Sequence, residues 1–183
     1  MPPKQRITRE MILEKSFAMF CREGMGAVNA RSVAKALNCS TQPIFSYFEG
    51  MEDLRGAIEQ KARDAFAEAV ASASESGSFV RCGTAYIRLA YEQPRLFARL
   101  LMSVGSEESI ALYAEGVEER LKSALAGQYG IDEQQTDRLY RDLWVFVHGL
   151  ACLVAVGRLA FDEQAVEQRL SAVSEVLAQK VRG

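Results

Sequence analysis

The chain has 183 residues, of which 49% are hydrophobic and 25% are charged. This composition is typical of one globular domain, or of a small module joined to a larger one, and a chain of this length needs no disulfide or metal to hold its core. The formal net charge is −2. Taken alone, this charge argues against a nucleic-acid-binding protein, because such proteins are usually basic.

The residues that most often bind metals are few and scattered. They are Cys21, Cys39, Cys82, Cys152 and the single histidine, His148. Zinc sites need clustered ligands, so we expect no metal and no cofactor. Without a recognisable signal peptide, the cysteines are interpreted as reduced thiols of a cytoplasmic protein. The longest stretch without Asp, Glu, Lys or Arg covers residues 143–157, which is too short to span a bilayer, so no membrane partner is expected.

Hydrophobic residues recur at helical spacing, and no alternating run with a hairpin turn is present. We therefore predict an all-α fold of nine helices. The predicted helices cover residues 8–22, 30–37, 41–48, 51–73, 79–93, 94–104, 106–129, 133–159 and 163–182.

Local signals support several of these boundaries in the first fifty residues. Thr8, Asn29 and Ser40 are residue types that cap helix N-termini. Pro43 falls in the first turn of its helix, where a missing N–H costs little. Asn38 stands between two short helices, where a left-handed residue is expected and Asn is tolerated.

Residues 29–48 form two short helices joined by a tight turn, which is a helix-turn-helix unit. The second helix of such a unit can enter the major groove of DNA. Small or hydrogen-bonding groups line it at Thr41, Gln42, Ser46 and Tyr47. Arg31 could contact a guanine edge, and Asn29, Thr41 and Tyr47 could bind phosphates. Short helices and turns also occur in all-helical proteins that do not bind DNA, so that alternative stays open.

The segment 8–54 resembles the N-terminal domain of TetR/AcrR-type transcriptional regulators. The matching residues are Ile12, Leu13, Phe20, Gly24, Ala34, Phe45, Tyr47, Phe48 and Leu54. The resemblance implies a TetR-like architecture, with a DNA-binding domain at residues 1–50 and a ligand-binding and dimerisation domain at residues 51–183. The candidate DNA-contact residues are Asn29, Ala30, Arg31, Thr41, Gln42, Pro43, Phe45, Ser46 and Tyr47.

The sequence departs from the family pattern at three positions. Phe45 stands where the family usually has Tyr, so a hydroxyl that reaches phosphate is lost. Asn38 replaces the usual Gly of the turn. Met51 lies where a Lys is common near the start of the fourth helix. Affinity for DNA is therefore expected to depend more on Tyr47 and on the basic residues Lys4, Arg6 and Arg9.

The remaining two thirds resemble a ligand-sensing domain. Trp144, His148 and Gly149 match the Trp-x-x-x-His-Gly signature of one C-terminal class of the family, and residues 86–103 resemble the helix-Pro-helix segment before it. Candidate ligand-binding residues are Tyr86, Phe97, Leu101, Met102, Tyr113, Trp144, His148 and Cys152. A lone His on an apolar face is most often structural, so both roles stay open for His148. One His cannot assemble a catalytic constellation, so no enzyme is expected.

The eighth and ninth predicted helices are the expected dimer surface. Helix eight is apolar nearly all round, and helix nine carries a stripe of Val166, Leu170, Val173, Leu177 and Val181. Complete burial under helices five to seven is the alternative. The family resemblance favours a two-fold homodimer, which predicts a palindromic operator.

The function expected from these features is a ligand-responsive regulator, acting as a repressor that a small apolar or aromatic effector releases from its operator. One alternative is a helical small-molecule-binding protein or enzyme without a DNA function, and another is a DNA-binding protein whose C-terminal domain only dimerises.

Residues 1–48 carry seven Lys or Arg against three Glu, a net charge of +4, and residues 49–183 carry −6. The overall charge is therefore the sum of a basic N-terminal segment, which favours binding to DNA, and an acidic remainder.

Overall fold

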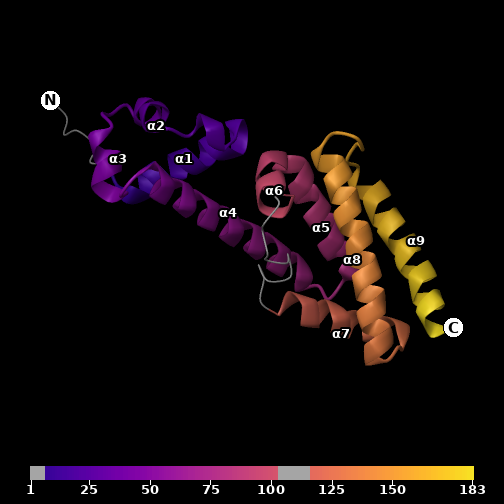
Figure 1. The fold of residues 1–183 in the computed structure, drawn as a ribbon. Coiled ribbons are helices and arrows are strands. Elements are labelled where there is room, and N and C mark those ends of the chain that lie inside the picture. Colours follow the sequence, from indigo (N-terminus) through magenta and orange to yellow (C-terminus); the bar gives the residue numbers. More distant parts are fainter. Residues whose placement is uncertain (1–6, 103–115) are drawn as a thin grey trace. The chain divides into compact units, whose positions relative to one another are not determined.

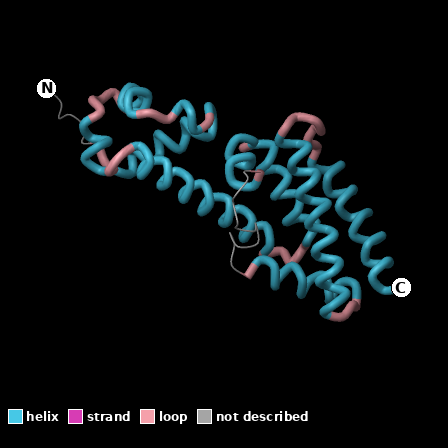
Figure 2. Tube along the Cα trace, in the orientation of Figure 1, coloured by secondary structure: helices cyan, strands magenta, loops and turns pink. Residues whose placement is uncertain are grey.

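The computed structural model describes residues 7–102 and 116–183, and every regular element in these ranges is helical (Figures 1 and 2). The all-α prediction is therefore confirmed. The nine α-helices in the described ranges are α1 (Arg9–Glu23), α2 (Ala30–Ala36), α3 (Gln42–Tyr47), α4 (Met51–Ser74), α5 (Phe79–Glu92), α6 (Pro94–Leu101), α7 (Val117–Tyr129), α8 (Glu133–Ala155) and α9 (Glu163–Arg182). A short 3₁₀ turn, η1 (Met25–Ala27), lies between α1 and α2.

The chain divides into two compact units, Met1–Asp64 and Ala65–Gly183, which we call the head and the body. The division lies inside α4, whereas the predicted domain boundary lies before it, at residue 50. The first part of α4 belongs to the head because it buries Leu54 and Ile58 completely. It is also tied to α1 by a salt bridge between Lys61 Nζ and Glu14 Oε1, 2.6 Å apart.

Helix caps in the head agree with the sequence at two of the three predicted positions. Thr8 caps α1, and its Oγ1 accepts a hydrogen bond from the backbone N–H of Met11 (3.2 Å). Asn29 caps α2. The prediction for Ser40 is wrong, because Thr41 is the N-cap of α3 and makes no side-chain capping bond. Thr41 has helical backbone angles, φ −74° and ψ −15°, whereas a capping side chain normally needs an extended backbone at that position.

The body is built around α5, which packs against α6, α7, α8 and α9. The approach of α5 to α8 and α9 is close at Gly83. A Cβ atom there would lie 3.0 Å from Leu170 Cδ1 and 3.1 Å from Val147 Cγ2, so only glycine fits without displacing its neighbours. On α9, Val166 and Leu170 are buried, but Val173, Leu177 and Val181 of the predicted stripe are only half-buried.

Two helices of the body end earlier than predicted, and one prediction cannot be compared. Helix α8 ends at Ala155 rather than at residue 159, because Gly157 takes a left-handed conformation (φ +69°) that turns the chain. Helix α6 ends at Leu101. The predicted helix start at residue 106 lies outside the described residues. No helix in the described ranges is long and apolar enough to cross a membrane.

Candidate nucleic-acid interface

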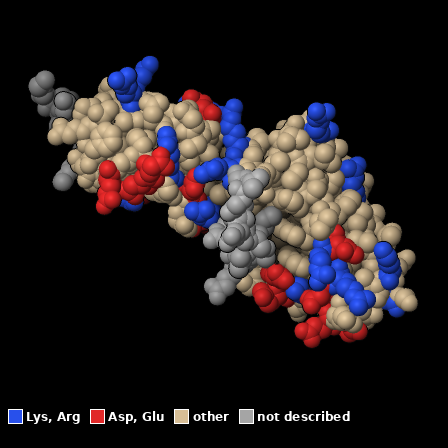
Figure 3. Space-filling model, viewed as in Figure 1, with Lys and Arg blue, Asp and Glu red and all other residues tan. Residues whose placement is uncertain are grey.

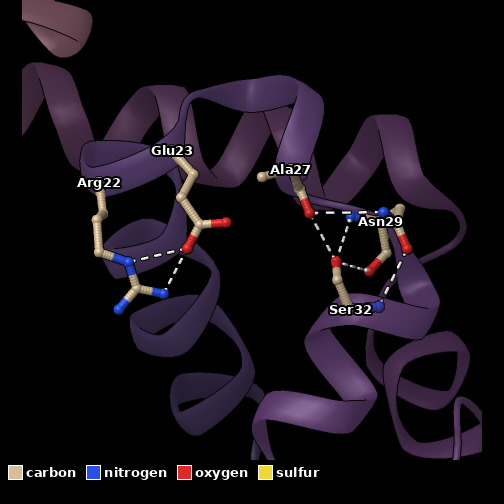
Figure 4. A network of polar contacts seen from close by, with 5 residues as sticks. All are labelled: Arg22, Glu23, Ala27, Asn29 and Ser32. Carbon is tan, nitrogen blue, oxygen red and sulfur yellow. Dashed lines mark hydrogen bonds and ion pairs between the residues drawn. The ribbon is translucent and has the colours of Figure 1, made fainter.

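The start of α2 is fixed by a reciprocal capping box (Figure 4). Asn29 Oδ1 accepts a hydrogen bond from the backbone N–H of Ser32 (3.0 Å), and Ser32 Oγ accepts one from the backbone N–H of Asn29 (3.1 Å). The Ser32 hydroxyl also donates to the carbonyl of Ala27 (2.6 Å), which anchors η1 to α2. Asn29 thus has a structural role, and its contact with DNA stays a prediction.

The turn between α2 and α3 takes the sharp geometry expected of a helix-turn-helix unit. Asn38 has a φ of +52°, the only positive φ among the described residues other than glycine, as the sequence predicts. The backbone N–H of Cys39 then donates to the carbonyl of Ala34 (3.0 Å), which closes the C-terminal end of α2. This geometry sets the direction in which α3 leaves the turn.

Helix α3 buries one face and exposes the other. Ile44 and Phe48 are buried in the head, whereas Gln42, Phe45, Ser46 and Tyr47 are exposed. Phe45 is 52% exposed and Tyr47 39%, and they are the large hydrophobic side chains that the described part of the head leaves exposed. The Ser46 hydroxyl donates to the carbonyl of Gln42 (3.0 Å).

Other candidate DNA-contact residues flank this exposed face. Arg31 is exposed on α2, while Ala30, Thr41 and Pro43 are half-buried. A cleft of about 850 Å³ also opens in the head. It is lined by Ile7, Met11, residues 37–40, Gln42, Pro43, Ser46 and Tyr47. The turn and one flank of α3 therefore share a single concave surface.

Charges near α3 are of both signs. The guanidinium of Arg9 lies over the ring of Phe48, 4.8 Å from its centroid, at the start of α1. The first turn of α4 is acidic at Glu52 and Asp53, and Asp53 Oδ2 accepts a hydrogen bond from the backbone N–H of Glu49 (3.0 Å). On the face drawn in Figure 3, both units carry charges of both signs. The acidic first turn disfavours phosphate binding at the start of α4, in line with the loss expected at Met51.

In the body, Tyr86 lies at the centre of an aromatic cluster. Its ring centroid is 5.0 Å from that of Trp144 and 5.4 Å from that of Phe97. The Tyr86 hydroxyl is hydrogen-bonded to His148 Nδ1 (2.9 Å), and His148 Nε2 lies 3.5 Å from Cys152 Sγ. Burial lowers the pKa of His148 and raises the pKa of the Cys152 thiol, so both groups are neutral at pH 7.

The predicted ligand-binding residues fall into different environments. Tyr86 and Phe97 are fully buried, so they belong to the core of the body. Leu101, Trp144, His148 and Cys152 are half-buried, and Met102 is exposed at the end of α6. Tyr113 lies outside the described residues. The structure thus brings Tyr86, Phe97, Trp144, His148 and Cys152 together.

Comparison with known proteins identifies the family. The sequence model of the "Tetracyclin repressor-like, C-terminal domain" family matches residues 79–177, more than half of the chain. The chain belongs to the TetR family. The match does not test the Trp-His-Gly class, which stays a prediction.

Individual relatives of this TetR-family protein agree with the assignment. The uncharacterized HTH-type transcriptional regulator YobS of Bacillus subtilis is 20% identical over 171 residues, 91% of this chain and 89% of YobS. A tetR-family regulator from Streptomyces coelicolor has a TM-score of 0.63 at 19% identity, covering 94% of this chain and 87% of that one. The multidrug binding protein EbrR, solved with imidazole, has a TM-score of 0.54 at 17% identity, covering 90% of this chain and 88% of that one.

These comparisons establish a helix-turn-helix transcriptional regulator rather than an enzyme. Regulators of the TetR family bind DNA and small-molecule effectors as dimers.

Sequence reasoning missed two features of the interface. The hydrogen bond between the Tyr47 hydroxyl and the carbonyl of Ile7 joins residues 40 positions apart, and no local sequence pattern predicts it. The role of Ser32 in the capping box was also missed, although a polar residue three positions after Asn29 is a recognisable signal.

Proposed function

We propose that this TetR-family protein is a ligand-responsive repressor, which binds a palindromic operator as a homodimer and leaves it when a small apolar or aromatic effector occupies the body. The exposed face of α3 carries the proposal. It presents Gln42, Phe45 and Ser46 on a helix whose other face is fixed in the head by Ile44 and Phe48. A helix presented in this way can place side chains against base edges.

The proposed DNA contacts divide by chemistry. Gln42 and Arg31 carry planar groups that can form paired hydrogen bonds with base edges. The hydroxyls of Thr41 and Tyr47 suit phosphate oxygens, which fix the position of the head without reading sequence. The net charge of +4 on residues 1–48 supports this orientation toward DNA.

Exposed apolar residues on α8 support a dimer through α8 and α9. Val145 is 68% exposed and Leu153 47%, and Val156, directly after the helix, is 56% exposed. Val145, Gly149 and Leu153 follow one another at intervals of four residues, so they form one row along the helix. On α9, Val176 is 65% exposed. A second copy of the chain would cover these side chains, and two-fold symmetry would then place two heads on an inverted repeat.

The end of α4 supports a route by which the body could act on the head. Ser74, in the last turn of α4, is completely buried, and its Oγ accepts hydrogen bonds from Arg120 Nη2 (3.0 Å) and Nε (3.3 Å) of α7. The Cys82 thiol of α5 contacts the carbonyl of Val70 in α4 (3.9 Å). A shift of α5 or α7 on effector binding would therefore move α4, which continues into the head. The effector acts only as far as it binds the two arrangements with different affinities.

The aromatic surroundings of Trp144 and His148 support an apolar or aromatic effector. Both side chains are half-buried beside Tyr86 and Phe97, and His148 is neutral because burial lowers its pKa. Neutral aromatic surroundings favour uncharged ring compounds over anions. EbrR, a structural relative, is itself described as binding multiple drugs.

Selection of DNA from a random duplex pool by the full-length protein tests the proposal. We expect recovered sequences to contain an inverted repeat. Aromatic compounds that raise the midpoint of thermal unfolding should then be added to the complex with the recovered duplex, and binding should be followed by fluorescence anisotropy. Release of the duplex is the expected result. A compound that stabilises the protein but leaves operator affinity unchanged would contradict the proposed ligand response, whereas failure of every aromatic compound to stabilise the protein would favour the alternative in which the body only dimerises.

A further inference from the structure

Helix α3 carries no charged side chain. Its sequence from Gln42 to Tyr47 contains neither Lys, Arg, Asp nor Glu. The contacts that most often select guanine come from Arg and Lys, so α3 itself lacks the groups for that contact. Base recognition by this helix must therefore use amide, hydroxyl and apolar groups.

Phe45 is the unusual member of the exposed face. Phe45 is 52% exposed, more than Tyr47 at 39%, whereas Ile44 of the same helix and Phe48 directly after it are buried. The Phe45 ring cannot bond to phosphate as the family's usual Tyr would. Covering the ring removes apolar surface from water, which is favourable wherever an apolar partner is available.

The major groove offers one such partner on a base edge. Thymine carries a C5-methyl group there, whereas adenine, guanine and cytosine present only hydrogen-bonding groups and ring carbons. Phenylalanine is among the side chains that pack against this methyl group. The chemistry of Phe45 therefore matches thymine.

Gln42 completes the pattern. It lies three residues before Phe45, so the two side chains are neighbours on the surface of α3. The hydroxyl of Ser46 already donates to the carbonyl of Gln42 within the helix, which leaves the Gln42 amide and the Phe45 ring as the side chains best suited to base edges. A Gln amide forms a bidentate pair with N6 and N7 of adenine.

We propose that α3 reads A·T base pairs, with the Phe45 ring packed on a thymine C5-methyl group and the Gln42 amide on a neighbouring adenine. This inference rests on the proposed function, because it assumes that α3 enters the major groove of an operator. It adds the identity of the bases that each half-site should present to α3.

The test uses duplexes that the full-length protein selects from a random pool. Each recovered half-site is resynthesised with deoxyuridine in place of individual thymidines, which removes only the C5-methyl group. Affinities are measured for the wild type and for Phe45→Ala. One position per half-site should be sensitive for the wild type, and loss of its methyl group should weaken binding about four-fold.

Variants of Phe45 test whether the sensitivity to the thymine methyl group comes from contact with the Phe45 ring. Phe45→Ala should bind the thymidine duplex more weakly than the wild type and should lose nothing further when uridine is substituted. Phe45→Leu, which keeps an apolar side chain, should retain part of the methyl dependence. Tyr91→Ala changes an exposed aromatic residue of the body and serves as the matched control, with DNA binding unchanged. Thermal unfolding of each variant checks that the fold is preserved.

Two results would overturn the inference. One is a wild type that is indifferent to every thymine methyl group in its selected half-site, and the other is a Phe45→Ala variant that remains as sensitive as the wild type. Either result leaves operator binding itself intact. If the full-length protein selects no sequence at all, the proposed function and the inference fail together.

Discussion

The hydroxyl of Tyr47, the last residue of α3, donates a hydrogen bond to the carbonyl oxygen of Ile7, 3.2 Å away. The bond joins the end of α3 to Ile7, which precedes α1. Both partners line the cleft beside the helix-turn-helix unit. Tyr47 therefore has a structural partner in the free protein, in addition to the phosphate contact predicted for it.

Tyr47→Phe should weaken DNA binding while changing the free energy of unfolding by at most about 1 kcal/mol, because an exposed hydrogen bond contributes little net stability. Ile7 follows the basic residues Lys4 and Arg6 in the sequence. Tyr47→Phe should have a smaller effect on affinity in a protein that also carries Lys4→Ala and Arg6→Ala. Strictly additive effects would assign Tyr47 to an independent phosphate contact.

Substitutions at Asn29 and Arg31 should affect different properties: the stability of the fold at Asn29 and the affinity for DNA at Arg31. Asn29→Ala removes one half of the capping box and should lower the free energy of unfolding by about 1 kcal/mol. Arg31→Ala should leave stability nearly unchanged and weaken specific binding by about 1–3 kcal/mol, as expected for a bidentate base contact. Urea unfolding and operator titration of both variants provide the measurements. Unaltered operator affinity of Arg31→Ala would remove Arg31 from the base-reading residues.

The dimer surface can be tested by placing charge on α8. Val145→Glu and Leu153→Glu should each convert the dimer to a monomer in analytical ultracentrifugation, because an unpaired carboxylate would be buried between the copies. Gln134→Glu adds the same charge at an exposed position in the first turn of α8 and serves as the control. Dimers that persist in both valine and leucine variants would show that this row of α8 lies outside the interface.

His148 should make stability fall in mild acid. Burial lowers its pKa below the ordinary value of 6.5 in the folded protein, so the unfolded chain binds the proton more readily. The resulting stability is present above pH 6.5 and is lost progressively as the pH falls below it. Because His148 is the single histidine, denaturant unfolding at about pH 7.5 and pH 5.5 should show this loss for the wild type and a smaller one for His148→Gln. Equal losses of stability in the wild type and in His148→Gln would contradict the assignment of this pH dependence to His148.

The sequence predicted most accurately those features that depend on neighbouring residues. The caps at Thr8 and Asn29 and the left-handed Asn38 follow from side chains that bond or turn within a few positions. Ser40 was wrongly predicted as a cap because the backbone conformation of Thr41, which no residue type dictates, decided where α3 begins.

Features that depend on packing between distant segments were less predictable. On α9, the small residues Ser174 and Ala178 are the buried ones in the second half, while the larger Val173 and Leu177 flank them. Periodicity selects apolar residues, but the closeness of the neighbouring helices favours small ones. The bond between Tyr47 and Ile7 and the tie between Ser74 and Arg120 likewise needed the tertiary structure.

Sequence-specific binding of DNA by the head is the central claim, and a salt titration tests it most directly. Affinities of the full-length protein for its selected duplex and for a random duplex of equal length are measured at increasing salt. Both should fall linearly on logarithmic axes as counterions are released. The selected duplex should keep an advantage of about a thousand-fold or more. Equal affinity for the two duplexes at every salt concentration would contradict the account.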